Sequence, residues 1–371
     1  MPRERNFYLA LASLIALGTV FGSMHQGHQE IQRTLLLQPT PQSQTVRQWS
    51  PMQFTEVDFA TSDPAWELSR GGSVDSGSAS LGESVFVLDW GQPAVRRLPS
   101  GGLLAATYLG PLAPGGDLTM PAIDFAVGSS GEMAAIFALE PGMRLFRPDG
   151  ELDRFVPVDS KPLRVVLLGA DRWATLTAVG ENLFALYDYE GTEIRKFGRL
   201  VDGPFQDRVL LDGCIAADGG GGFVYASNYL GLLAAYTGEG ELRYLVGTIN
   251  GVSEELPTIL QDSKGTRRLR PGTLRPLLAV HVNQGKIFLL SERENQRARK
   301  RILDIYRSDD GRYLESVRLP NRPRDAFFAG DFLYTVHARQ VRRWLPSPTF
   351  PDLALGRETT AAEPRLAHRE E

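Results

Sequence analysis

The chain has 371 residues, among them 38 glycines, 24 prolines and one cysteine, and its formal net charge at pH 7 is −4. This length excludes a single small domain, although one all-β domain of about 300 residues is ordinary. Cys214 has no partner for an internal disulfide, so the fold cannot depend on oxidation, and its apolar neighbours predict a buried thiol. Abundant turn residues and the lack of long amphipathic helical periods favour β-structure.

The amino terminus carries Arg3 and Arg5 ahead of an uncharged apolar run from Phe7 to Gly22. A helix from Phe7 to Met24 would measure roughly 27 Å, slightly less than a bilayer core of about 30 Å. We therefore predict a signal anchor or transmembrane helix over residues 1–24. Because positive charge precedes the run and does not follow it, we expect a single pass through the inner (cytoplasmic) membrane, with the remainder on the periplasmic side. Cleavage as a secretory signal is the alternative.

Two segments separate this run from the first repeated unit. Residues 25–44 contain six glutamines and two prolines, a polar composition that predicts a flexible tether. Residues 45–59 carry apolar residues among polar ones and belong to none of the repeats that follow. Their apolar members are Val46, Trp49, Phe54, Val57 and Phe59.

One unit of three short strands and a tight turn then recurs along the chain. The two clearest copies span residues 173–197 and 223–246, and their turn glycines, Gly191 and Gly240, are 49 residues apart. In both copies an aromatic residue lies four positions before the glycine. Further copies cover residues 84–109, 133–156 and 286–319, and a sixth opens at 331–344 without a turn glycine or an outer strand. Such a period indicates antiparallel sheets arranged as blades.

We therefore predict an all-β fold, a six-bladed β-propeller of four-stranded antiparallel blades over residues 45–346. A last blade without its outer strand would close the ring weakly and expose an edge. We expect residues 45–59 to supply that strand and so join the two ends of the domain. The alternative, two stacked β-sandwiches, predicts paired cores and no closure. Residues 347–371 follow a proline-rich break and are predicted to form a mobile tail.

The link at residues 197–205, followed by the segments 215–219 and 223–228, resembles the blade-to-blade link and inner strand of NHL-type six-bladed propellers. The resemblance extends over about residues 45–346. Its motif is degenerate, because the aspartate expected after the strand is Asp89 in the first copy but a serine in later ones. The resemblance implies a propeller with a binding surface. Some propellers are lyases or lactone hydrolases that use a metal, and the residues that they need have no match here.

An insertion at residues 251–276 is too long for an ordinary connection. Residues 264–301 hold 11 basic and two acidic side chains, a balance of +9, so the remainder of the chain carries −13. This asymmetry predicts contact with an acidic partner protein or with anionic lipid headgroups, and a solvated loop and hairpin is the alternative. Nucleic acid is disfavoured, because no aromatic residues lie between the arginines. The candidate interaction residues are Arg267, Arg268, Arg270, Arg275, Arg293, Arg297, Arg299, Lys300 and Arg301.

A search for a reactive centre finds no catalytic constellation. Of five histidines only His281 and His337 fall in the propeller, too few for a three-histidine zinc site, and we interpret both as structural. No Gly-x-Ser-x-Gly elbow is present, and the glycine clusters at 128–131 and 219–222 join strands and do not open helices. We interpret the recurring aspartates as turn and loop hydrogen-bond acceptors: Asp89, Asp124, Asp218 and Asp325. We expect no catalytic residue, cofactor or metal.

The sequence thus favours a noncatalytic, membrane-tethered propeller that acts as an interaction or assembly subunit of a larger membrane complex, with protein partners. Two alternatives stay open. An exported hydrolase or lyase would use the central channel and bind a metal. A soluble periplasmic propeller that binds a carbohydrate or peptide would require cleavage of the amino terminus.

Overall fold

The computed structural model describes residues 39–346, apart from 45, 74–83, 100–101, 112–118, 129, 160, 170, 179, 201–208, 251–256, 264, 266, 274 and 293–300. The predicted anchor at residues 1–24, the tether as far as residue 38 and the tail at 347–371 lie outside the described residues. Within the described part, no helix is long and apolar enough to cross a membrane.

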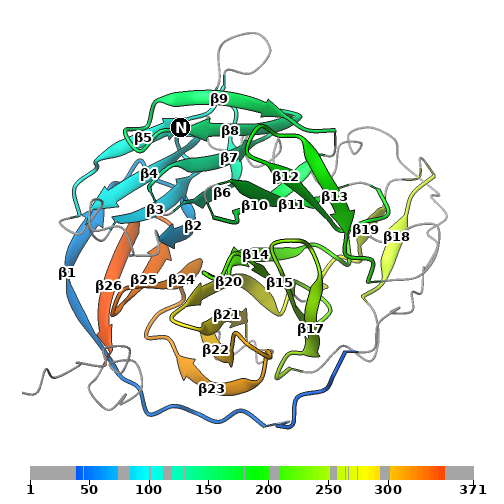
Figure 1. Cartoon of the computed structure of the whole chain (residues 1–371). Helices are drawn as coiled ribbons and strands as arrows, with labels where there is room; N and C mark the ends of the chain where they lie inside the picture. Colours follow the sequence, from blue (N-terminus) through cyan, green and yellow to red (C-terminus); the bar gives the residue numbers. More distant parts are fainter. Residues whose placement is uncertain are drawn as a thin grey trace, which may run out of the picture.

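Six four-stranded antiparallel sheets surround a central axis (Figure 1), which confirms the predicted propeller. Each blade runs outward in chain order from an inner strand. Blades one to three consist of β2 (Leu68–Ser73), β3 (Ser84–Asp89), β4 (Ala94–Pro99) and β5 (Ala106–Leu109); β6 (Ala122–Val127), β7 (Met133–Phe137), β8 (Gly142–Phe146) and β9 (Leu152–Pro157); and β10 (Pro162–Leu167), β11 (Arg172–Thr177), β12 (Phe184–Asp188) and β13 (Glu193–Phe197).

The other three blades continue the ring. Blade four consists of β14 (Gly213–Ala217), β15 (Phe223–Ser227), β16 (Leu232–Tyr236) and β17 (Leu242–Gly247), and blade five of β20 (Leu277–Asn283), β21 (Lys286–Glu292), β22 (Arg301–Arg307) and β23 (Tyr313–Arg318). Blade six contains β24 (Asp325–Ala329), β25 (Phe332–His337) and β26 (Gln340–Pro346). Between blades four and five, β18 (Ile259–Gln261) and β19 (Arg267–Leu269) form a separate hairpin within the predicted insertion.

The fourth strand of blade six comes from the opposite end of the domain. Strand β1 (Phe54–Ser62) pairs antiparallel with β26, with Phe54 opposite Pro346 and Ser62 opposite Gln340. This confirms the predicted closure, although the strand begins nine residues later than residue 45 and ends three residues beyond Phe59. The ring is therefore closed by backbone hydrogen bonds between residues almost 300 positions apart.

Residues 39–53, here called the strap, run along the outside of the ring before β1. In Figure 1 the blue segment passes from blade four along the outer strand of blade five to blade six. Thr40 forms a parallel bridge with Val246 of β17, and Trp49 forms one with Ser316 of β23. The side chain of Gln42 donates to the Gly247 and Gly311 carbonyl oxygens at 2.8 and 2.9 Å. The strap thus covers edge strands whose backbone groups would otherwise lack a protein partner.

The apolar core consists of layers between neighbouring blades. Six clusters of buried side chains occupy the six blade-to-blade interfaces, including the one between blades six and one. The second strands are almost entirely buried, because both of their faces meet a neighbouring blade. Burial on both faces explains why β3, β7 and β15 read as continuous apolar runs in the sequence.

The turn glycines of the repeat pack against the preceding blade. Gly191 and Gly240 have φ of +95° and +80°, which only glycine adopts readily. A Cβ atom at Gly191 would lie 2.1 Å from Val156 of blade two, and one at Gly240 would lie 2.8 Å from Phe197 of blade three. The recurrence of glycine at these turns therefore reflects the close packing of each turn on the preceding blade.

Candidate functional site

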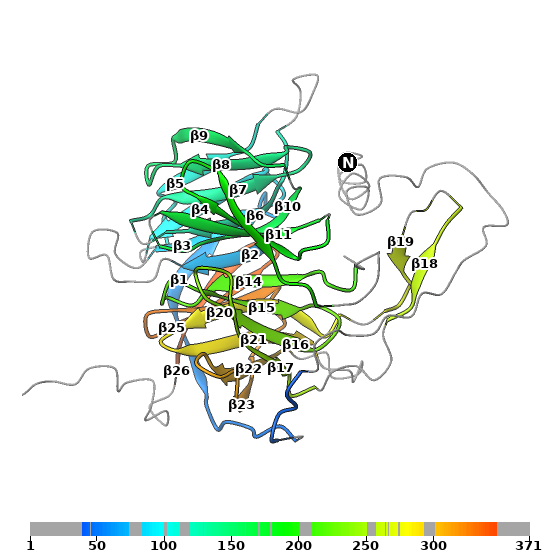
Figure 2. The ribbon, with the colours of Figure 1, turned by 45° about the vertical axis from the view of Figure 1, so that its right-hand side comes forward.

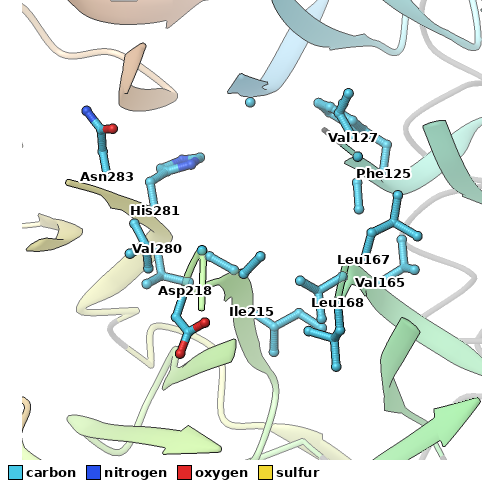
Figure 3. Close-up of a pocket in the computed structure, with 18 of the residues that line it drawn as sticks. Phe125, Val127, Val165, Leu167, Leu168, Ile215, Asp218, Val280, His281 and Asn283 are labelled. Atoms are coloured by element: carbon cyan, nitrogen blue, oxygen red, sulfur yellow. The ribbon is translucent and has the colours of Figure 1, made fainter. Parts of the chain in front are cut away.

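The central channel contains a cavity of about 350 Å³. All six inner strands contribute to its lining, so every blade takes part. Figure 3 shows the walls, which are mostly apolar side chains from β6, β10, β14 and β20. The labelled apolar residues are Phe125, Val127, Val165, Leu167, Leu168, Ile215 and Val280.

A histidine and a buried aspartate form one polar pair of the channel. His281 Nε2 lies 2.9 Å from Asp325 Oδ1, and the imidazole ring projects into the cavity (Figure 3). Asp325 also accepts hydrogen bonds from the backbone N–H groups of Gly71 and Ala326, both at 2.8 Å. Burial alone would raise the pKa of Asp325, but the attraction of His281 and these hydrogen bonds outweigh it, so the pKa is lowered. The carboxylate is ionised and orients the imidazole.

An arginine and a second buried aspartate form the other pair. The Arg70 guanidinium is ion-paired with Asp124 Oδ1, and Asp124 Oδ2 accepts the Val165 N–H at 2.8 Å. The second arm of Arg70 lies 3.5 Å from the Ile215 carbonyl oxygen on β14. Arg70 thus reaches from blade one to blades two and four. Its pKa is lowered, chiefly because burial removes the cation from water.

These two pairs connect the inner strands of all six blades, because Arg70 also reaches Ile215 on β14. Asp325 on β24 contacts β2 and β20, while Asp124 on β6 contacts β2 and β10. Because Asp124 is paired with Arg70 and Asp325 with His281, neither buried aspartate is left unpaired, which would destabilise the fold. The same pairs leave the imidazole and part of the guanidinium facing the cavity.

The interpretation of the four aspartates holds for two of them. Asp89 accepts N–H groups of Gly91 and Gln92, and Asp218 accepts those of Gly220 and Gly222, as expected for turns. It is wrong for Asp124 and Asp325, which are ion-paired within inner strands. The available signal for Asp124 was a charged residue inside an apolar strand, Ala122–Val127.

The predicted basic residues divide into three groups. Arg267 and Arg268 lie on β19, followed by Arg270 and Arg275, while Arg301 begins β22. Arg293, Arg297, Arg299 and Lys300 lie outside the described residues. Arg301 is paired with Glu292 at 3.2 Å. Its charge is therefore partly neutralised within the ring.

The hairpin β18–β19 presents the exposed members of this set. Figure 2 shows the hairpin standing away from the stacked blades. Its base is fixed because Ile259 is fully buried in the core between blades three and four, with Leu269 packed against the same cluster. Arg268 and Arg270 are exposed. The interaction role of the basic residues stays a prediction.

The outer rim differs between the two halves of the ring. On β23 of blade five, beneath the strap, Tyr313, Ser316 and Val317 are buried, whereas four of the five residues of β13 in blade three are exposed. Among the strands that the structure describes, none pairs with the outer edges of β5, β9 and β13. Four large apolar side chains are exposed on these three strands and are here called the apolar rim: Leu109, Leu152, Phe155 and Ile194.

Metal ions in proteins are held by clusters of histidine, cysteine, aspartate or glutamate side chains. Among the described residues, no group of three or more histidine, cysteine, aspartate or glutamate side chains could hold a metal ion. Cys214 is buried, as predicted, with Sγ 3.4 Å from the Leu278 carbonyl oxygen. His281 and Asp325 engage each other and would need further ligands to bind a metal.

No family model and no curated protein matches the sequence. The fold is similar to virginiamycin B lyase from Staphylococcus aureus, with 12% identity and a TM-score of 0.50 over 79% of this chain and 99% of that chain. It is also similar to a member of the DUF4221 family from Bacteroides vulgatus, with 9% identity and a TM-score of 0.54 over 80% of this chain and 98% of that one. Likenesses at such low identity show the propeller fold alone.

Proposed function

We propose that the chain is a noncatalytic, NHL-like propeller, tethered to the inner membrane on its periplasmic side, that serves as an interaction or assembly subunit of a larger membrane complex. The observation that supports this best is the unequal rim. The strap and β1 cover the edges of blades four to six, and among the described residues no strand covers the edges of blades one to three.

The uncovered edges have the chemistry that an extended partner segment requires. An edge strand offers a row of N–H and C=O groups, and a partner strand can satisfy them by adding to the sheet. Leu152 and Phe155 on β9 and Ile194 on β13 add exposed apolar surface. The strap uses the same kind of contact on blade five, where the Ser50 N–H donates to the Ser316 carbonyl and the Ser316 N–H donates to the Gln48 carbonyl, at 2.9 and 2.8 Å.

The predicted anchor fits this arrangement because the strap fixes where the tether meets the ring. Thr40 lies against β17, so the tether would join the propeller at blade four. A segment anchored at residues 1–24 would then hold the rim at a high local concentration near its partners. The hairpin β18–β19, with Arg268 and Arg270, follows blade four and would contact an acidic partner surface or anionic lipid headgroups.

One observation favours a second candidate, an exported hydrolase or lyase. The His281–Asp325 pair faces the channel, and a carboxylate that orients an imidazole is a common arrangement for a general base. This candidate would require a metal supplied with further ligands, so metal analysis of the purified protein discriminates it. A soluble periplasmic ligand-binding propeller is discriminated by the mass of the mature protein.

Site-specific photocrosslinking in membranes tests the leading proposal. A photoreactive amino acid is introduced at Ile194, on the apolar rim, or at Val46, which is 76% exposed on the strap side. We expect one discrete adduct from position 194, absent from position 46, and loss of co-purification with that partner in Ile194→Glu. Equal labelling at both positions, or unchanged co-purification of the variant, would contradict the proposal.

A further inference from the structure

We propose that the central cavity binds a small molecule with an apolar body and one carboxylate end, and that Arg70 receives the carboxylate. This inference goes beyond the proposed function and does not depend on it, because the cavity is formed by the six inner strands and the turns that follow them. No residue of the apolar rim lines the cavity.

The size and walls of the cavity suit a small organic ligand. Its volume of about 350 Å³ falls in the range of about 300–1,000 Å³ that is typical of such pockets. Val127, Leu167 and Val282 line it near the ends of their strands, and the turns that follow the inner strands form its rim. Glycines are frequent in these turns, as at Gly169 and Gly330, so few side chains narrow this end.

The two charged pairs lie away from this rim, whereas Asp218 and Asn283 lie beside it. Arg70 is the third residue of β2, and Asp325 is the first residue of β24, whereas the rim glycines follow the ends of the strands. Asp218 lines the cavity near the rim, but its carboxylate is engaged by Arg243 at 2.5 Å and by the N–H groups of Gly220 and Gly222. A ligand would therefore place its polar end deep and its apolar part towards the rim.

At the deep end the carboxylate acceptors are engaged by the protein, and the Arg70 side chain lines the cavity. Both oxygen atoms of Asp124 and both of Asp325 accept hydrogen bonds or ion pairs from the protein. Arg70 has five N–H donors, and its partners among the described residues are Asp124 and the Ile215 carbonyl, the latter at 3.5 Å, the outer limit for a hydrogen bond. Its side chain is 18% exposed, and Arg70 belongs to the cavity lining.

The surroundings of Arg70 disfavour its charged form. Burial lowers the pKa of Arg70, and the like charges of Arg164 and Arg275 act in the same direction, although Cys214 and Asp325 oppose them. A cation disfavoured by its surroundings is stabilised by a ligand carboxylate, and arginine binds carboxylates with two parallel hydrogen bonds.

Ligand-observed NMR and calorimetry on the full chain test this inference with benzoate and hexanoate as probes, and with benzamide and hexanamide as neutral analogues of the same shape. We expect saturable binding of at least one carboxylate, and binding of its amide about tenfold weaker, because the amide lacks the charge that Arg70 recognises. Absence of saturable binding by both carboxylates, or equal affinity for the matching amides, would overturn the inference.

Cavity-filling variants locate the binding. Ala216 lines the cavity, so Ala216→Phe should weaken carboxylate binding at least about tenfold, whereas Val46→Phe on the exposed strap should leave it unchanged. Val282→Phe repeats the test from β20 if Ala216→Phe does not fold. A folded cavity variant that binds as tightly as the parent protein would place the ligand elsewhere and refute the proposal.

Discussion

A single histidine in the closing blade makes the stability depend on pH. Trp344 Nε1 donates to Thr335 Oγ1 at 2.9 Å, so the Thr335 hydroxyl can donate to His337 Nε2, 3.1 Å away. This pattern requires a neutral imidazole. Burial, together with the positive charge of Arg342, lowers the pKa of His337 to about 4, from its ordinary value of 6.5.

We expect the free energy of unfolding to fall as the pH is lowered from about 6.5 to about 4, because the unfolded chain binds a proton that the folded chain excludes. The effect should be about 1–2 kcal/mol, since His337 is only partly buried and solvent screens its charge. Urea unfolding at a series of pH values measures it. His337→Gln should lose this component, and a variant with the same pH dependence as the parent would contradict the assignment.

At the same scale, single charged residues explain where prediction from sequence succeeds and fails. Asp89 and Asp218 precede glycine-containing turns, so their roles could be predicted from local chemistry. Asp124 and Asp325 are ion-paired with Arg70 and His281, which lie 54 and 44 positions away in the chain. Such pairings depend on the closed ring, so local sequence patterns do not reveal them.

Among the elements, the strap contributes the cation of one buried ion pair. Arg47 Nε and Nη2 lie 3.0 and 3.1 Å from the two carboxylate oxygens of Asp304, which also accepts hydrogen bonds from Ser291 and Ser316. The Asp304 side chain is 1% exposed. The strap therefore supplies the cation that a buried carboxylate of blade five requires.

Arg47→Gln should destabilise the protein by about 2–4 kcal/mol, because the Asp304 carboxylate loses its cation while it stays buried. Chemical denaturation measures this change. The matched control is Arg307→Gln, because the Arg307–Asp310 pair is 44% exposed on both sides and its loss should change the stability far less than the loss of Arg47. If the two substitutions have equal effects, the strap does not depend on this ion pair.

The outer three strands of most blades could be predicted, whereas the inner strands were less evident. Middle strands such as Phe223–Ser227 are continuous apolar runs, and the turn glycines recur because each packs on the preceding blade. Inner strands such as Leu68–Ser73 mix arginine, serine and glycine, because one side meets the channel. The glutamine at position 42 read as part of a tether, yet its amide bonds two blades at once.

For the whole molecule, the ends of the chain divide the ring into two halves. The strap and β1 cover blades four to six, and the apolar rim lies on blades one to three. The same covering segment would lead to the membrane in the proposed arrangement. If the proposal holds, attachment to the membrane and presentation of the partner surface would therefore fall to different halves of the ring.

Ring closure by β1 leads to a prediction about truncated chains. A chain that begins at residue 39 keeps the strap and β1, so its thermal unfolding midpoint should match that of the full chain. A chain that begins at residue 63 loses all pairing with β26 and the buried side chains of Met52 and Phe59. This loss should approach the whole stability of a typical domain, about 5–15 kcal/mol, and abolish cooperative unfolding. Near-ultraviolet circular dichroism measures the transitions.

Addition of a peptide of residues 39–62 should restore cooperativity, because the strand binds blade six without requiring the covalent link. If the chain from residue 63 unfolds at the same midpoint as the chain from residue 39, closure by β1 does not hold the ring together.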